Sequence, residues 1–137
     1  MKEIILEAKV EKLGELLSCI DKELGDAGCT MKAQMQIDIA VEEIFVNIAH
    51  YAYESGDGKA VIQIETDKSA AKAMFTFIDE GKPYNPLEKE DPDVTLPAEE
   101  RPIGGLGIYI VKKTMDEVTY KFEDGKNILK IVSSWQK

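Results

Sequence analysis

Two polar residues one helical turn apart are the first candidates for chemistry. Within the stretch IDIAVEEIFVNIAHYAY, Glu43 and Asn47 are four residues apart, so a helix would place their side chains next to each other. Asparagine is a poor residue for the middle of a helix, because its amide competes for backbone hydrogen bonds. Its carbonyl oxygen suits Mg²⁺, and a neighbouring carboxylate can take a proton from a nucleophile. The alternative is that both residues belong to the solvated side of the helix.

A second polar group follows the apolar run AKAMFTFID. Asp79 ends this run, and Gly81 comes two residues later. Such a pattern is often only a turn, in which the aspartate bonds to the backbone beyond it. The functional alternative is a buried carboxylate that accepts a hydrogen bond from an amino group, with Gly81 letting a flat ligand approach the backbone.

The third stretch, IGGLGIYIVKK, places glycines at 104, 105 and 107 at the start of a helical pattern. It lacks the GxxxxGK[ST] spacing of a Walker A loop. It also lacks the third glycine of a dinucleotide-binding fingerprint, because Ile110 stands at that position. The remaining interpretations are a tight turn or a helix N-terminus whose free N–H groups accept an anion such as phosphate.

Hydrophobic patterning predicts the elements that position these residues. Apolar residues at helical spacing, among them Ile37, Val41, Ile44 and Ile48, predict helices that pack on a sheet, and Thr30 is a candidate helix cap. Alternating segments and the Asp124-Gly125 turn predict hairpins. Helices on one face of such a sheet make a two-layer α/β (α+β) sandwich. The expected strands are 3–9, 60–66, 71–79, 117–124 and 126–135, and the expected helices are 10–25, about 30–54 and 105–116.

Residues 80–102 differ in character from the rest of the chain. All five prolines of the protein lie in this stretch, together with many acidic residues. A loop of this length inside a compact domain is commonly a functional lid or a disordered segment.

Composition limits the classes of function. The 137 residues fit one domain, 1–137, and the formal net charge of −9 disfavours nucleic acid and anionic membranes as partners. The sequence shows no transmembrane run or signal peptide, so we expect a cytoplasmic protein in which Cys19 and Cys29 are reduced. His50 is the single histidine, and the sequence offers no obvious set of residues for a zinc cluster or a Ser-His-Asp triad. We expect His50 to pack locally or to line the edge of a pocket.

Together, EEIFVNIAHYAY, DEGKPYNP and RPIGGLGIYIVKKTMDEVTY resemble the three nucleotide-binding motifs of the Bergerat-fold ATPases and kinases, which include the histidine kinases. The single-domain length and the last motif are most similar to the bacterial anti-sigma-factor serine/threonine kinases. The resemblance implies a mostly antiparallel mixed sheet with helices on one face, and an ATP lid at about 84–103.

Carried over position by position, the resemblance implies a role for each matched residue. Glu43 would be the general base and Asn47 the Mg²⁺ ligand, while Asp79 would accept the adenine amino group. The implied cofactor-binding positions are Asn47, His50, Asp79, Gly81, Pro83, Arg101, Gly104, Gly105, Leu106 and Gly107, with Lys82 as a further candidate for phosphate or lid contacts. Two details differ from the family pattern: His50 follows Asn47 by three residues rather than four, and the second motif is not DxGxG.

Three hypotheses follow. In the first, ATP and Mg²⁺ bind and a phosphoryl group passes to a serine or threonine of a STAS-domain anti-anti-sigma protein, which controls a sigma factor; the resemblance also suggests a homodimer. In the second, the domain is a regulatory module that binds ATP or ADP and a partner protein without phosphoryl transfer. A third, a dinucleotide-dependent enzyme, depends on Gly105-x-Gly107 alone.

Overall fold

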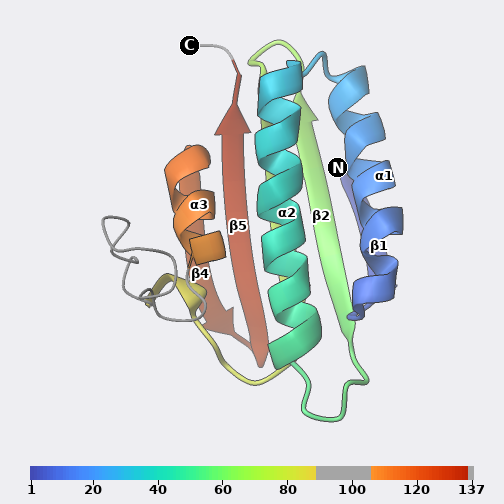
Figure 1. Ribbon diagram of the computed structural model, residues 1–137, viewed down its shortest axis with the longest axis vertical. Helices are drawn as coiled ribbons and strands as arrows, with labels where there is room; N and C mark the ends of the chain where they lie inside the picture. Colours follow the sequence, from blue (N-terminus) through green and yellow to red (C-terminus); the bar gives the residue numbers. More distant parts are fainter. Residues whose placement is uncertain (89–105, 136–137) are drawn as a thin grey trace.

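Five strands and three α-helices make up the part of the chain that the computed structural model describes, residues 1–88 and 106–135 (Figure 1). The elements occur in the predicted order. Their bounds are β1 Lys2–Glu7, α1 Leu13–Asp26, α2 Met31–Tyr51, β2 Lys59–Asp67, β3 Lys72–Asp79, α3 Leu106–Thr114, β4 Glu117–Glu123 and β5 Lys126–Ser134, with 3-10 turns η1 Val10–Lys12 and η2 Pro86–Glu88.

The strands form one antiparallel sheet in the order β1-β2-β3-β5-β4. Two helices lie between β1 and β2 and return the chain to the end of the sheet where β1 stops, so these strands are antiparallel. β4 runs in the same direction as β3, but β5 lies between them and pairs antiparallel with both. The antiparallel character is therefore confirmed. The expected mixed pairing does not occur among the described strands, because β5 separates the two parallel ones.

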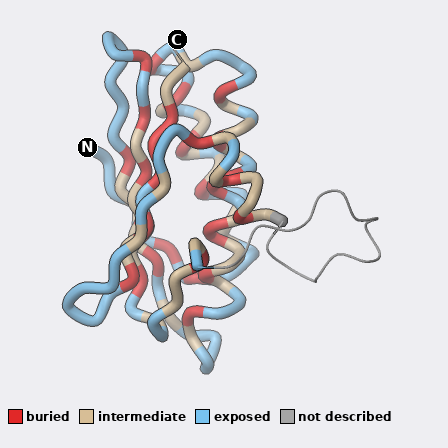
Figure 2. The backbone as a smooth tube through the Cα atoms, turned by 90° about the vertical axis from the view of Figure 1, so that its left-hand side faces the viewer, coloured by how far each residue is buried: buried red, intermediate tan, exposed pale blue. Residues whose placement is uncertain are grey.

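The helices cover one face of the sheet, as predicted, and Figure 2 shows them all on the same side of it. Period-two alternation explains this, because every second strand side chain faces the helices. In β3 these inward positions include Phe75 and Phe77, which are fully buried. Phe45 of α2 is buried against the same layer, and burying such a side chain stabilises the fold by roughly 1.5–3 kcal/mol.

Helix α2 positions the site, and its boundaries follow from local chemistry. Thr30 caps its N-terminus, because the Thr30 hydroxyl accepts a hydrogen bond from the Ala33 N–H at 3.2 Å. The predicted apolar face is buried along the whole helix. The helix ends at Tyr51, earlier than predicted, and the carbonyl of Ala52 then accepts a hydrogen bond from Lys82 N at 2.9 Å. No helix within 1–88 or 106–135 has both the length and the apolar content that crossing a bilayer requires.

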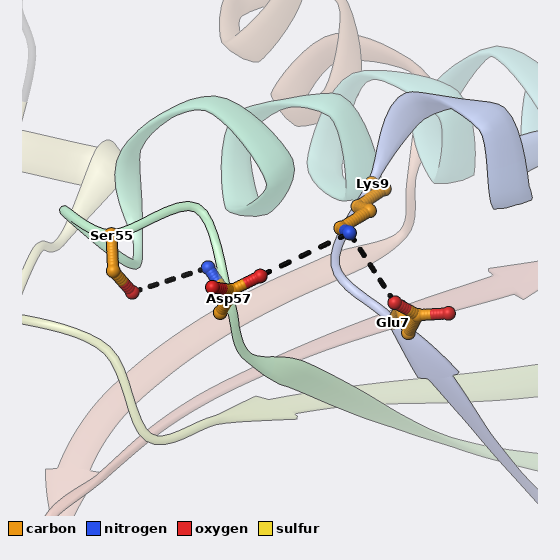
Figure 3. Close-up of polar contacts among 4 residues, drawn as sticks. All are labelled: Glu7, Lys9, Ser55 and Asp57. Carbon is orange, nitrogen blue, oxygen red and sulfur yellow. Dashed lines mark hydrogen bonds and ion pairs between the residues drawn. The ribbon is translucent and has the colours of Figure 1, made fainter.

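Two connections meet at the same end of the sheet and are held together by polar contacts (Figure 3). Lys9 Nζ lies 3.4 Å from Glu7 and 3.9 Å from Asp57, and the Asp57 N–H donates to the Ser55 hydroxyl at 3.2 Å. The connection that follows β1 is thereby joined to the turn that follows α2, the turn predicted at 55–58.

Other boundaries differ slightly from the predictions. The first predicted helix begins as the η1 turn and becomes α-helical at Leu13. Helix α3 ends at Thr114, because the Asp116 N–H bonds to the carbonyl of Val132 and so starts the pairing of the next strand with β5. The β4–β5 hairpin is confirmed, and Asp124 and Gly125 have φ values of 54° and 78°, as a type I′ turn requires.

Candidate functional site

Glu43 and Asn47 are neighbours on α2, as their spacing predicts. The Asn47 amide donates a hydrogen bond to Glu43 Oε1 at 3.4 Å. Both side chains are half-buried, whereas Glu42 is exposed to solvent. The two adjacent glutamates therefore differ in environment: Glu42 faces solvent, whereas Glu43 faces helix α3.

Glu43 contacts α3 at Gly107. A Cβ placed on Gly107 would lie 1.9 Å from Glu43 Cδ and 2.2 Å from each carboxylate oxygen, so no other residue fits unless Glu43 moves. Gly107 is the second residue of α3. The carboxylate thus lies against the first turn of the helix, where backbone N–H groups and the helix dipole favour negative charge. The group that approaches the backbone at Gly107 is therefore Glu43.

Asp79 lies at the end of β3 and is buried, with 6% of its surface exposed. Its Oδ1 accepts hydrogen bonds from the Gly81 N–H at 2.9 Å and from Asn127 Nδ2 at 2.9 Å. Burial raises the pKa of the Asp79 carboxyl, although both hydrogen bonds act to lower it. The turn and the buried carboxylate, which the sequence offered as alternatives, are both present.

Asn127 is the main site residue that the sequence analysis missed. It lies opposite Asp79 in the β3–β5 register and is equally buried. Besides Asp79, its Nδ2 donates to the Lys82 carbonyl at 2.9 Å, and its Oδ1 accepts from the Tyr84 N–H at 3.2 Å and from the Tyr120 hydroxyl. One amide therefore joins β5, β3, β4 and the segment that follows β3.

A sequence signal for Asn127 does exist. It occupies an inward position of β5, two residues before Leu129 and four before Ile131, which are both buried. A polar residue at an inward position needs a partner, because an unpaired buried amide is costly. The pattern therefore marks Asn127 as part of a polar cluster, although it does not identify Asp79 as its partner.

A cleft opens between α2, α3 and the ends of β3 and β5, next to these polar groups. Its walls are mainly apolar and aromatic, as is usual for sites that take a flat organic group. The lining residues are Ile44, Asn47, Ile48, Tyr51, Ala52, Phe77, Asp79, Lys82, Tyr84, Pro86, Ile108, Tyr120, Asn127 and Leu129. Asn47 and Asp79 are thus both part of one cleft, and Lys82 is the single cation in its described lining.

Gly81 makes a close contact within the protein, and its expected role beneath a ligand stays a prediction. A Cβ at this position would lie 2.2 Å from the carbonyl oxygen of Ala52, so the residue that directly follows α2 occupies the space. Gly81 is not among the residues that line the cleft, whereas its neighbour Lys82 is. The close approach at Gly81 seen here is therefore to Ala52.

The remaining candidate residues lie beside the cleft, at the start of α3 or outside the described residues. His50 is exposed, and its ring packs edge-on against Tyr51, which lines the cleft, so its binding role stays a prediction. Pro83 is exposed and lies between two lining residues. Leu106 begins α3. Arg101, Gly104 and Gly105, and the predicted lid beyond residue 88, lie outside the described residues.

The arrangement has two chemically different ends. At one end, Asp79 offers a buried acceptor beside flat aromatic walls, which suits a heterocycle with an amino group. At the other end, Glu43 and Asn47 provide oxygen atoms beside the N-terminal turn of α3, a position that favours anions and hard cations.

Residues 6–133 match the family model described as the histidine kinase-like ATPase domain. The serine-protein kinase RsbW of Staphylococcus aureus (strain JH9) is 28% identical over 140 residues, which cover 93% of this chain and 85% of that protein. The serine-protein kinase RsbW of Bacillus thuringiensis (strain Al Hakam) is 26% identical over 93 residues, 66% of this chain. The match spans 58% of the length of that Bacillus relative.

A solved structure shares the fold. The structure of the RsbU and RsbW domains of a Mycobacterium tuberculosis protein superposes with a TM-score of 0.61, at 11% identity, over 98% of this chain and 32% of that chain. The five-stranded antiparallel sheet with three helices is the Bergerat architecture that the three sequence motifs imply. The chain therefore belongs to the histidine kinase-like ATPase domain family, and it is distantly similar to the proteins named serine-protein kinase RsbW.

Proposed function

We propose that this protein binds ATP in the cleft and transfers its terminal phosphoryl group to a serine or threonine of a STAS-domain anti-anti-sigma protein. The observation that carries the proposal is that Asn47 and Asp79, from two separate motifs, line one cleft. Glu43, which accepts a hydrogen bond from Asn47, lies against Gly107 of the third motif. The relatives named serine-protein kinase RsbW support the reaction class.

The base end of the site accounts for a nucleotide rather than a simple phosphate. An adenine ring fits between apolar and aromatic walls that include Phe77 and Tyr120, with its amino group donating to the buried Asp79. ADP presents the same base and is expected to bind as the product. Lys82 is the cation of the described lining, and in this proposal it offsets phosphate charge.

The phosphate end fits Mg²⁺ by the chemistry of its donors. The Asn47 amide nitrogen is used toward Glu43, which leaves Oδ1 of Asn47 as a neutral oxygen ligand. No cluster of three or more acidic, histidine or cysteine residues that could hold a metal occurs within 1–88 and 106–135, so phosphate oxygens and water would complete the coordination. When bound, Mg²⁺ offsets charge on the transferring phosphate.

Glu43 is the general base in this proposal. Its carboxylate takes the proton of the attacking hydroxyl while the hydroxyl oxygen bonds to the γ-phosphorus, and the bond from that phosphorus to the β–γ bridging oxygen breaks to release ADP. Contact with Gly107 fixes the carboxylate between α2 and α3. The sigma factor as a binding partner, and a homodimer, belong to the same proposal and are supported by the RsbW likeness alone.

The test compares Glu43→Gln with Glu42→Gln, a matched control because Glu42 is the exposed neighbour on α2. Transfer of the labelled γ-phosphate of ATP to STAS-domain proteins of the same organism is measured, together with ADP affinity. Glu43→Gln should slow transfer by about 10²-fold or more with ADP affinity within a fewfold of wild type, and Glu42→Gln should change neither. Equal transfer rates in the two variants would exclude Glu43 as the base.

A second candidate function is a module that binds ATP or ADP to control a partner without transferring phosphate. The observation in its favour is that the Glu43 carboxylate already contacts Asn47 and Gly107. This function would be supported over the kinase function if calorimetry detects ADP binding while no STAS-domain protein becomes labelled in the transfer assay.

A further inference from the structure

The orientation of the Asn127 amide is fixed by its neighbours. Nδ2 faces the Lys82 carbonyl at 2.9 Å, which can only accept, and Oδ1 faces the Tyr84 N–H at 3.2 Å, which can only donate. The amide therefore cannot flip without losing both bonds. It follows that Asn127 always presents a donor to Asp79, at 2.9 Å.

This fixed donor determines what Asp79 can offer a ligand. Oδ1 of Asp79 already accepts from Asn127 and from the Gly81 N–H, and two donors on one oxygen favour the ionised carboxylate. No hydrogen bond to Oδ2 occurs among the described residues, and Asp79 lines the cleft. The carboxylate therefore meets a ligand as an acceptor, and a carbonyl oxygen placed there would be repelled.

We propose that Asn127 is the specificity-determining residue of this cleft, and that it makes the cleft select 6-amino purines over 6-oxo purines by holding Asp79 as an acceptor. Asn127 is a positioning residue, because it acts through Asp79. The inference depends on the proposed function, since it requires a purine nucleotide with its base against Asp79.

ADP and IDP are the matched probes, because adenine and hypoxanthine differ at the 6-position and the adjoining ring nitrogen. Calorimetry should give wild-type protein a preference for ADP of about tenfold or more, the order expected for one charge-assisted hydrogen bond. Lowering the pH should reduce this ratio, because protonated Asp79 becomes a donor that can serve the 6-oxo group.

Asn127→Thr and Asn127→Val form a pair of nearly equal shape that differs in a single donor. Both lose the bonds to Lys82 and Tyr84, so both weaken nucleotide binding to a similar degree. Threonine can still donate to Asp79 and should keep the ADP/IDP ratio within about threefold of wild type.

The valine variant removes the donor and so raises the pKa of the buried Asp79 further. The ratio should then fall by about tenfold, and its decline with acid should begin at a higher pH.

The outcomes separate the two proposals. Equal ADP/IDP ratios in the Thr and Val variants would show that Asn127 is only structural. Wild-type protein that binds ADP and IDP equally would overturn the specificity proposal and leave nucleotide binding intact. Wild-type protein that binds neither would overturn the proposed function as well. If neither variant folds, the wild-type pH profile decides, and an ADP/IDP ratio that rises as the pH is lowered would overturn the proposal.

Discussion

The Glu43 carboxylate lies in the space that a side chain at Gly107 would occupy, 1.9 Å from the position of its Cβ. This contact joins the middle of α2 to the first turn of α3. It explains why a glycine stands inside a helix, where glycine costs about 1 kcal/mol relative to alanine.

Gly107→Ala should displace Glu43 and abolish phosphoryl transfer while the protein stays folded. In a Glu43→Ala background the obstacle is gone, so the same substitution should raise the free energy of unfolding by up to about 1 kcal/mol. A double-mutant cycle by urea denaturation measures this coupling. Gly14→Ala is the control, because nothing lies within 4 Å of a Cβ at that helical position. If the effects of Gly107→Ala and Glu43→Ala on the free energy of unfolding are additive, the contact is contradicted.

Asp79→Asn should weaken ADP binding by about tenfold or more. Either the amide presents an NH₂ group to the amino group of the base, or it turns that NH₂ toward the donors of Asn127 and Gly81, and both arrangements place donor against donor. Calorimetry with ADP measures the effect, and thermal unfolding confirms that the variant is folded. An unchanged affinity would contradict the placement of the base at Asp79.

Asp38 and Asp21 form an acidic pair outside the cleft, and we expect this pair to make the free energy of unfolding depend on pH. They face each other from α2 and α1, and one carboxyl oxygen of each is buried without a hydrogen-bond partner among the described residues. Burial, the hydrogen bond with Asp21 and the charge of Asp21 raise the pKa of Asp38 to about 7. The folded state therefore binds more protons than the unfolded state between about pH 4 and pH 7, and this contribution to stability is lost as the pH rises through that window.

Asp38→Asn should remove this dependence and raise the melting temperature at pH 8 relative to wild type, because an amide carries no charge. Melting temperatures of wild type and Asp38→Asn, measured from about pH 4 to pH 8, test this prediction. Asp26→Asn is the control, because Asp26 is an exposed residue of α1. A variant whose pH profile runs parallel to that of wild type would show that Asp38 does not titrate in this way.

Thr30→Ala should lower the free energy of unfolding by about 1 kcal/mol, because the Ala33 N–H loses its partner at the start of α2. Thr30→Ser keeps the oxygen and should restore most of the stability. Urea denaturation at a single pH compares the three proteins, and an alanine variant as stable as wild type would show that the cap contributes nothing.

Local patterns predict much of the fold and the proximity of Glu43 and Asn47. The capped start of α2, its buried face and the Asp124-Gly125 turn depend on neighbours in sequence, and all three were predictable. The pairing of Glu43 with Asn47 follows from helical geometry in the same way. The partnership of Asp79 with Asn127, 48 residues apart, depends on β5 lying beside β3, which no local pattern specifies.

The cleft is divided between the two layers of the fold. Asp79 and Asn127 belong to the sheet, whereas Glu43, Asn47 and Gly107 belong to the helices that cover it. A nucleotide that reaches both ends would act as a clamp between the layers, and any sliding of α2 over the sheet would change the fit at both ends together. Nucleotide binding would therefore stabilise the packing of the helices on the sheet, and tighter packing of the two layers would in turn strengthen nucleotide binding.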